Sequence, residues 1–232
     1  MSHRILIIDD DPSISEMLKK FLIKEGYGVI TAFNGKDGLS LFLSEDVDLI
    51  VIDIMMPKLD GIEAIKLIRE KSTVPILIIS AKDTDVDKAL GLGFGADDYL
   101  SKPFSLVEFS ARIKAGIRRA TKYTTFSEKK KEEHISFDQF VVDLNSYSIY
   151  KKDEEIKLTS KEYELLKLFV KNQNRVFTKS DLYKLVWNDH YYGNENVINV
   201  HIRRLREKIE EDPSNPKYIK TLWGIGYKWV GH

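Results

Sequence analysis

Short apolar runs alternate with amphipathic stretches of about ten to fifteen residues throughout the first half of the chain. The runs are RILIID, GVITAF, DLIVID, PILIIS and DDYLSK. The first, third and fourth consist almost wholly of Ile, Leu and Val, which is typical of strands covered on both faces by helices. This alternation predicts five βα units that form an α/β domain with a doubly wound, five-stranded parallel sheet.

The pattern changes after residue 120. Residues 121–134 (TKYTTFSEKKKEEH) are almost entirely polar or charged, as in a flexible linker. Beyond them, the β-like runs ISFDQFVVDL, YSIYKK and EEIKL precede three helical segments and a hairpin-like stretch, YIKTLWGIGYKWV. We therefore expect an α/β domain over residues 1–120, a linker over 121–134 and an α+β domain over 135–232.

Composition narrows the class of protein. The chain has 232 residues and no cysteine, and no apolar run approaches the roughly 18 residues that a membrane span needs. The first ten residues, MSHRILIIDD, reach two aspartates before a secretory apolar stretch develops. A cytoplasmic protein without a membrane partner is expected. Residues 1–121 carry 16 basic and 19 acidic side chains and residues 122–232 carry 20 and 17, so the second half is the better suited to a polyanion.

Acidic residues end two of the predicted strands. Asp9, Asp10 and Asp11 follow the first run, and Asp53 ends the third. If the strand order is 2-1-3-4-5, these two strand ends are neighbours at the edge where such sheets bind ligands. Several carboxylates within about 6 Å repel one another, so the cluster favours a bound cation, and oxygen ligands suit Mg²⁺. Asp11, which precedes Pro12, is interpreted instead as a helix cap.

Two further strand ends complete a phosphoryl-transfer set. Ser80 ends the fourth run with a hydroxyl, and Lys102 follows the fifth with a positive charge. A carboxylate nucleophile, a divalent cation, a hydroxyl and a lysine suit chemistry that depends on positioning and charge neutralisation. A single Asp, Ser or Lys at a strand end is usually a turn or cap residue, but their joint appearance at four strand ends favours a functional site.

These motifs resemble a known family. ILIIDDDPSI, DLIVIDIMMPKLDGIEAI, PILIISAKD and GADDYLSKPFSLVEFSARI are similar to the receiver domain of bacterial two-component response regulators, specifically the OmpR/PhoB family. The resemblance implies a flavodoxin-like receiver in which Asp53 accepts a phosphoryl group from a sensor histidine kinase. The resemblance also implies that Asp9, Asp10 and the carbonyl of Met55 bind Mg²⁺ together with Asp53. Ser80 and Lys102 would contact the phosphoryl group, and Tyr99 would be an aromatic switch residue. Because the receiver's substrate is itself, no enzyme activity on a separate substrate is expected.

The segment NENVINVHIRRLREKIEED has helical periodicity. Its apolar stripe is Ile198, Ile202, Leu205 and Ile209, and the other side carries Asn196, Asn199, Val200, Arg203, Arg204 and Glu207. Arginines on such a helix suit guanine edges and phosphates, although a basic helix taken alone is more often a solvated face. A short helix before it and a Gly-containing hairpin after it predict a winged-helix domain that binds double-stranded DNA.

LTSKEYELLKLFV, VINVHIRRLREKI and YIKTLWGIGYKW resemble the effector domain of the same family, so the likeness covers roughly residues 3–230. The DNA contacts that the resemblance implies are Asn199, His201, Arg203, Arg204 and Arg206 on the helix, Thr221 and Tyr227 at the wing, and Trp187 in the loop before the helix. Two positions depart from the family pattern. Trp223 stands where an Arg is usual, which puts an Arg contact in the minor groove in doubt, and Asn199 replaces a common acidic residue.

The family also implies control by dimerisation. The opposite charges expected to cross a twofold axis in the phosphorylated homodimer are Lys88 with Glu108, Asp97 with Arg112, and Asp98 with Arg119. The DNA-bound form has RNA polymerase as a further candidate partner. Two alternatives stay open at this point: a DNA-binding protein that keeps the receiver only as a dimerisation scaffold, and a Mg²⁺-dependent enzyme acting on small phosphate compounds.

Overall fold

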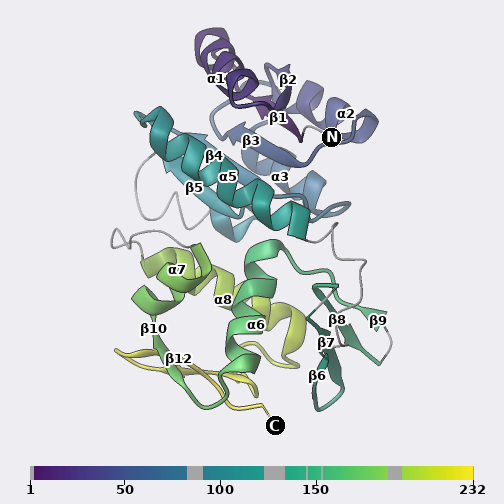
Figure 1. Ribbon diagram of the computed structural model, residues 1–232, viewed down its shortest axis with the longest axis vertical. Coiled ribbons are helices and arrows are strands. Elements are labelled where there is room, and N and C mark those ends of the chain that lie inside the picture. Colours follow the sequence, from purple (N-terminus) through teal and green to yellow (C-terminus); the bar gives the residue numbers. More distant parts are fainter. Residues whose placement is uncertain are drawn as a thin grey trace. The chain divides into compact units, whose positions relative to one another are not determined.

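The computed structural model describes residues 3–82, 91–122, 134–144, 146–152, 154–187 and 195–231 (Figure 1). The chain divides into two compact units, Met1–Thr121 and Lys122–His232, and each is described by itself. Among the described residues, no helix combines the length and the apolar character that crossing a membrane requires.

The first unit is built on a five-stranded parallel sheet with the order β2-β1-β3-β4-β5. Its strands are β1 (Arg4–Ile8), β2 (Gly28–Ala32), β3 (Leu49–Asp53), β4 (Ile76–Ser80) and β5 (Asp98–Ser101). Its helices are α1 (Pro12–Lys24), α2 (Gly35–Ser44), α3 (Gly61–Arg69) and α5 (Leu106–Lys122). The predicted parallel sheet and its strand order are confirmed.

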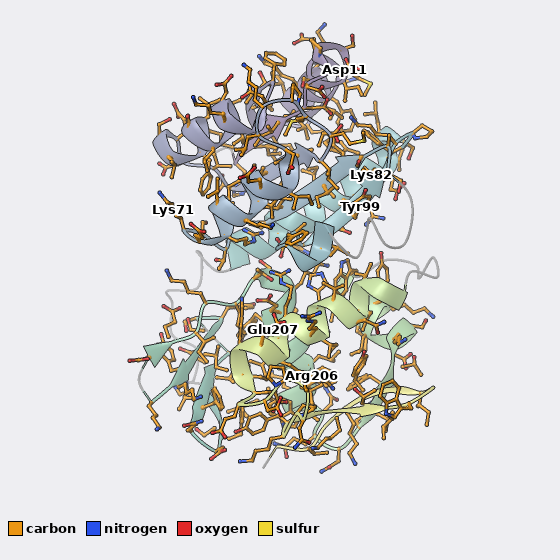
Figure 2. All side chains as sticks on the ribbon, turned by 180° about the vertical axis from the view of Figure 1, so that it is seen from behind. Asp11, Lys71, Lys82, Tyr99, Arg206 and Glu207 are labelled. Carbon is orange, nitrogen blue, oxygen red and sulfur yellow. The ribbon has the colours of Figure 1, made fainter. Side chains whose placement is uncertain are left out.

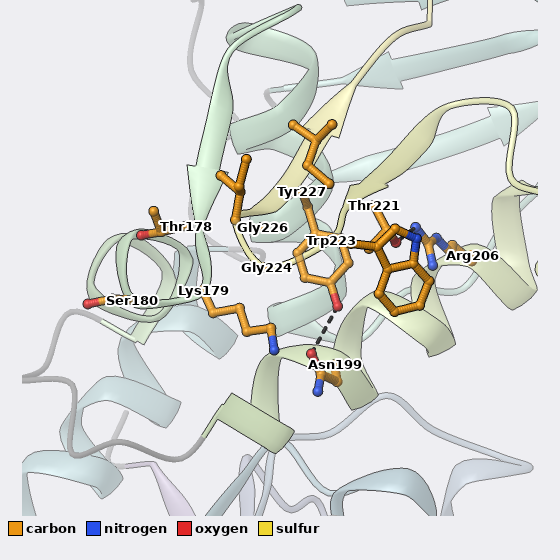
Figure 3. Close-up of a pocket in the computed structure, with 12 residues that line it drawn as sticks. Thr178, Lys179, Ser180, Asn199, Arg206, Thr221, Trp223, Gly224, Gly226 and Tyr227 are labelled. Atoms are coloured by element: carbon orange, nitrogen blue, oxygen red, sulfur yellow. Dashed lines mark hydrogen bonds between the residues drawn. The ribbon is translucent and has the colours of Figure 1, made fainter.

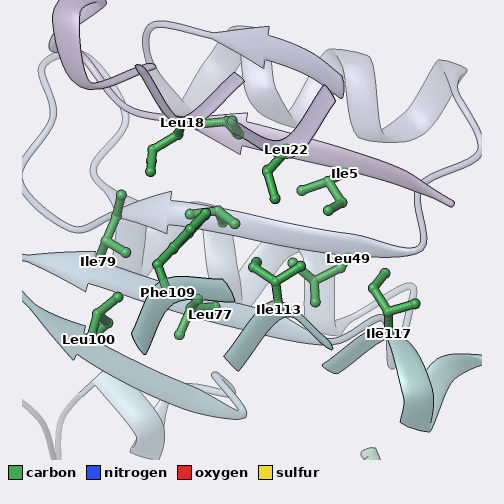
Figure 4. Packing of buried hydrophobic residues seen from close by; sticks show 12 residues of the cluster. Ile5, Leu18, Leu22, Leu49, Leu77, Ile79, Leu100, Phe109, Ile113 and Ile117 are labelled. Carbon is green, nitrogen blue, oxygen red and sulfur yellow. The ribbon is translucent and has the colours of Figure 1, made fainter. Parts of the chain in front are cut away.

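A closed apolar core explains the continuous Ile, Leu and Val runs. On one face of the sheet, side chains from β1, β3, β4 and β5 pack against Leu18 and Leu22 of α1 and against Phe109, Ile113 and Ile117 of α5 (Figure 4). Each of these five helical side chains is at most 5% exposed. Burying a side chain of this size stabilises the fold by roughly 1.5–3 kcal/mol. The apolar positions of α1 and α5 therefore determine which face of each helix covers the sheet.

Two side chains cap the starts of helices in the first unit. The Asp11 carboxylate accepts hydrogen bonds from the backbone N–H groups of Ser13 (2.8 Å) and Ile14 (3.3 Å), which starts α1. Ser105 accepts one from the N–H of Glu108 at 3.1 Å. The interpretation of Asp11 as a cap is therefore confirmed, and its carboxylate stabilises the first turn of α1.

The segment between the two units is shorter at both ends than the linker expected over residues 121–134. Helix α5 continues through Thr121 and Lys122, and β6 begins at His134. Residues 123–133 lie outside the described residues.

The second unit combines two antiparallel sheets with three helices. The four-stranded sheet has the order β6-β7-β8-β9, and the three-stranded sheet has the order β10-β12-β11. The strands are β6 (His134–Phe137), β7 (Phe140–Asp143), β8 (Ser148–Lys151), β9 (Glu154–Glu155), β10 (Val176–Thr178), β11 (Ile219–Leu222) and β12 (Gly226–Trp229). The helices are α6 (Ser160–Lys171), α7 (Lys179–Trp187) and α8 (Glu195–Ile209).

Helix α8 packs against both α6 and α7. The predicted stripe of Ile198, Ile202, Leu205 and Ile209 is buried, with at most 1% of each side chain exposed. Three helices followed by the β11–β12 hairpin form the predicted winged helix, with that hairpin as the wing.

Candidate functional sites: a carboxylate site and a nucleic-acid interface

The acidic ends of β1 and β3 converge as expected. Ile8 pairs in register with Ile52, so Asp9 follows β1 where Asp53 ends β3. Asp9, Asp10 and Asp53 each present a carboxylate oxygen, and these three atoms lie within 4.8 Å of one another. Asp9 and Asp53 are buried, whereas Asp10 is exposed. The cluster therefore opens toward solvent on one side, as a site loaded from solution requires.

Lys102 supplies the counter-charge. Its Nζ lies 2.9 Å from Asp9 Oδ2 and 2.5 Å from Asp53 Oδ2. Burial alone would lower the pKa of Lys102, but its hydrogen bonds to Asp53 and Asp9 outweigh this and raise the pKa above its ordinary value. Burial raises the pKa of Asp9, against the opposing effect of Lys102 and of the Asp11 N–H. One ammonium against three carboxylates leaves a net negative site with oxygen ligands only, which fits Mg²⁺.

The chain around Asp53 folds tightly over its carboxylate. The N–H of Met55 donates to Asp53 Oδ1 at 2.9 Å, and a Cβ on Gly61 would lie 2.1 Å from the Asp53 carbonyl oxygen. Gly61 is a residue that our reading of the sequence missed: only a glycine lets the start of α3 come this close. The carbonyl of Met55 as a metal ligand stays a prediction.

Ser80 and Tyr99 lie on the neighbouring strands β4 and β5. Ser80 ends β4, is fully buried, and accepts a hydrogen bond from the N–H of Lys82 at 3.2 Å. A hydroxyl that accepts in this way still carries one O–H donor. Tyr99, in β5, is 7% exposed and donates its hydroxyl to the carbonyl of Lys82 at 2.6 Å (Figure 2). Both side chains are therefore linked to Lys82, in the segment that follows β4.

On α8, one of the predicted DNA-contacting arginines is largely exposed to solvent. The side chain of Arg203 is 80% exposed and pairs only with Glu207 of the same helix in the described residues, at 2.9 Å. Arg204 turns the other way: its side chain is 11% exposed and lies 3.0 Å from Glu162 of α6, which is fully buried. Arg203 therefore fits the expected role, whereas Arg204 stabilises the contact between α8 and α6.

Two other predicted DNA contacts are buried. His201 has no exposed surface, and its ring centroid lies 5.0 Å from that of Trp187. Trp187 ends α7 rather than lying in the following loop, is 3% exposed, and stacks on Tyr183 at 5.3 Å. Packing between α7 and α8 removes both side chains from the surface, which does not support the expected DNA contacts of His201 and Trp187, and these contacts stay predictions.

The remaining predicted contacts connect the wing to α8. Arg206 donates to the carbonyl of Ile219 at 2.6 Å and to Oγ1 of Thr221 at 2.8 Å. The hydroxyl of Tyr227 donates to Oδ1 of Asn199 at 2.9 Å (Figure 3). These bonds hold the base of the wing against the exposed side of the helix.

Comparison with known proteins finds a family model for part of each unit. Residues 5–114 match the family model "Response regulator receiver domain", and residues 153–229 match "Transcriptional regulatory protein, C terminal". The uncharacterized transcriptional regulatory protein YcbL of Bacillus subtilis (strain 168) is 55% identical over 223 residues, which cover 96% of this chain and 98% of that protein. The chain belongs to the OmpR/PhoB family of response regulators.

Two solved structures extend the similarity over both units. The response regulator DrrB, a Thermotoga maritima OmpR/PhoB homologue, is 30% identical with a TM-score of 0.51 and covers all of both chains. A point mutant of RitR is 25% identical with a TM-score of 0.75 and covers 98% of this chain and 99% of that one. This response regulator is thus a DNA-binding transcription regulator of a two-component system, which implies a kinase partner.

Several charges that we expected to cross a dimer axis are paired within this response regulator. Asp97 is 4% exposed and lies 2.8 Å from Arg69. Arg112 contacts Asp98 at 2.9 Å and Glu108 at 2.8 Å. Lys88 and the side chain of Arg119 lie outside the described residues. Asp97 and Arg112 thus have partners within the receiver, and their pairing across a dimer axis stays a prediction.

A hollow of about 430 Å³ lies between the wing, α8 and the start of α7 (Figure 3). Its lining residues are Thr178, Lys179, Ser180, Asn199, Arg206, Thr221, Leu222, Trp223, Gly224, Ile225, Gly226 and Tyr227. This lining holds two cationic side chains and no carboxylate. Lys179 and Ser180 escaped our reading of the sequence, because neither belongs to α8 or the wing.

Proposed function

We propose that this response regulator is switched by phosphorylation of Asp53 and that the phosphorylated form binds DNA through α8 and the wing. The observation that carries the proposal is the convergence of Asp9, Asp10 and Asp53 within 4.8 Å, with Lys102 Nζ 2.5 Å from Asp53. A capping or purely structural role explains neither three clustered carboxylates nor a lysine directed at two of them.

In the proposed reaction, an oxygen of the Asp53 carboxylate attacks the phosphorus of a phosphohistidine on the sensor kinase. The P–N bond breaks, a P–O bond forms, and the histidine leaves with the electron pair. Asp9 and Asp10 would hold Mg²⁺ together with Asp53, and the ion would supply positive charge against the phosphoryl oxygens. Lys102 and the Ser80 hydroxyl would then contact the transferred group.

The geometry also supports a route from the phosphoryl group to the surface. Ser80 and Tyr99 both contact the backbone of Lys82. The Ser80 hydroxyl accepts a hydrogen bond from the Lys82 N–H, and the Tyr99 hydroxyl donates one to the Lys82 carbonyl. If the Ser80 hydroxyl turns toward a phosphoryl group, the backbone at Lys82 shifts and the acceptor of Tyr99 moves with it. We propose that this change favours a receiver homodimer, in which Asp98, Glu108 and Arg112 exchange partners across the axis and Asp97 stays buried.

The experiment measures DNA binding and association together. Full-length protein is incubated with Mg²⁺ and a small acyl phosphate, and its affinity for double-stranded DNA selected from a random pool is followed by fluorescence anisotropy, with light scattering for mass. The proposal predicts at least tenfold tighter binding and a doubled mass on phosphorylation in the wild type, and neither in Asp53→Asn. The matched control is Asp60→Asn at the exposed N-cap of α3, since Asn caps a helix as well as Asp. Equal binding with and without phosphorylation would instead favour the scaffold alternative.

A further inference from the structure

Trp223 stands at the tip of the wing, in a tight turn between β11 and β12. The turn is closed by a 2.9 Å hydrogen bond from the N–H of Ile225 to the carbonyl of Leu222. Gly224 has φ +73° there, a conformation that glycine adopts without strain. Trp223 is 91% exposed and Ile225 is 58% exposed. Together these two side chains form an apolar tip on the wing, and clustered exposed apolar side chains can mark a site of interaction with a partner.

The wing is held rigidly below this tip. Arg206 bonds to Thr221 at 2.8 Å, and Tyr227 bonds to Asn199 at 2.9 Å. Both bonds join the strands of the wing to α8, so the indole is presented from a fixed base (Figure 3). A contact made from a preorganised base loses little conformational entropy when the partner binds.

The charges around the tip identify the class of partner. The hollow behind it contains Lys179 and Arg206 and no carboxylate among its lining residues. Lys220 and Lys228 pair directly across β11 and β12, and like charges in such a pair are destabilising in the isolated protein. A polyanion removes that repulsion. An apolar tip on a cationic hairpin therefore fits DNA better than a neutral protein surface.

We propose that the Trp223 indole enters the DNA minor groove and makes an uncharged contact that favours A·T base pairs. This inference rests on the proposed DNA-binding function. The apolar walls of the minor groove suit the indole ring, and side chains that enter it often act as apolar wedges. The indole N–H donates to the adenine N3 or thymine O2 acceptors, whereas the guanine 2-amino group offers a second donor in the same place.

Fluorescence tests the position of the indole directly. All three tryptophans lie in the second unit, and Trp187 (3%) and Trp229 (0%) are buried, so acrylamide quenching in the free protein reports on Trp223. Acrylamide is neutral, so phosphate charge does not exclude it. We expect the quenchable emission to be lost in Trp223→Phe and kept in Trp187→Phe, and to be protected in the wild type when DNA binds.

Affinity and its salt dependence test the chemistry of the contact. Trp223→Ala is expected to weaken binding about tenfold with an unchanged log-log salt slope, because the lost contact carries no charge. Trp223→Arg is expected to steepen the slope by about one. The control is Val141→Ala, an exposed apolar residue on β7 in the other sheet, which is expected to leave binding unchanged.

Base changes test the groove. Replacing the A·T pairs under the wing by G·C is expected to weaken binding by the wild type several-fold, and I·C pairs, which lack the guanine 2-amino group, are expected to restore it. Trp223→Ala should respond little to either change.

Three results would overturn the inference. The first is wild-type binding with undiminished quenching of Trp223, and the second is wild-type affinity in Trp223→Ala. The third is protection of Trp223 from acrylamide quenching that increases with protein concentration in the absence of DNA. That result would assign the tip to contacts between copies of the chain. A wild type that binds no DNA at all would instead contradict the proposed function.

Discussion

The hydroxyl of Tyr227 in β12 donates a 2.9 Å hydrogen bond to the side-chain amide oxygen of Asn199 in α8. The bond joins two residues that are 28 positions apart, one in the wing and one in α8. It links the two elements that we propose to contact DNA, so we expect it to affect binding without carrying any charge.

Tyr227→Phe removes this bond and keeps the ring. A neutral hydrogen bond contributes about 1 kcal/mol, so we expect DNA affinity to fall about fivefold. The log-log salt slope should stay constant, because no phosphate contact is lost. Anisotropy titrations at several salt concentrations measure both quantities, and a changed slope would mean that Tyr227 contributes to phosphate binding.

The neighbours Arg203 and Arg204 should behave differently when each is changed to alanine. Arg203 is 80% exposed, so Arg203→Ala should weaken binding on most sequences and reduce the log-log salt slope by about one. Arg204 is 11% exposed and pairs with buried Glu162, so Arg204→Ala should chiefly lower the free energy of unfolding of the second unit. An unchanged slope in Arg203→Ala would remove Arg203 from the phosphate contacts.

The pH dependence of stability should depend on Glu162. Burial alone would raise its pKa, but the charges of Arg204 and Lys208 lower the pKa below its usual value. A lowered folded-state pKa stabilises the fold above the unfolded-state value, about 4.3, and this contribution is lost as the pH falls through the folded-state pKa. Glu162→Gln should therefore lose about 3 kcal/mol at neutral pH, and the difference from the wild type should shrink in acid.

Urea unfolding followed by tryptophan fluorescence measures this effect, because all three tryptophans lie in the second unit. Glu164→Gln, at a half-buried position of the same helix, is the control. A wild type and a Glu162→Gln variant that lose stability in parallel below about pH 4.3 would contradict the assignment.

The sheet and the carboxylate site follow from the sequence because both rest on short-range rules. Buried parallel strands are continuous apolar runs, and residues that follow neighbouring strands meet at one edge, which brings Asp9 and Asp53 together. On α8 the same approach was only partly successful. Helical periodicity separates the apolar stripe of α8 from the rest of its surface. It does not show that α6 covers Arg204 and that α7 covers His201.

The close approach at Gly61 was missed for a related reason. A glycine in DGIEAI is compatible with a turn, a cap or a tight contact, and only the path of the chain past Asp53 selects the last. Similarly, the burial of Asp97 beside Arg69 depends on α3 and the start of β5 meeting, which a reading of local charge patterns does not reveal.

The central claim is that Asp53 accepts a phosphoryl group, and intact-mass spectrometry tests it most directly. Wild type, Asp53→Asn and the control Asp60→Asn are each incubated with Mg²⁺ and a small acyl-phosphate donor, and also with a phosphorylated sensor-kinase domain. The account predicts a single phosphoryl adduct in the wild type and in Asp60→Asn that depends on Mg²⁺ and is absent in Asp53→Asn. An adduct of equal yield in Asp53→Asn, or no adduct in the wild type with either donor, would contradict it.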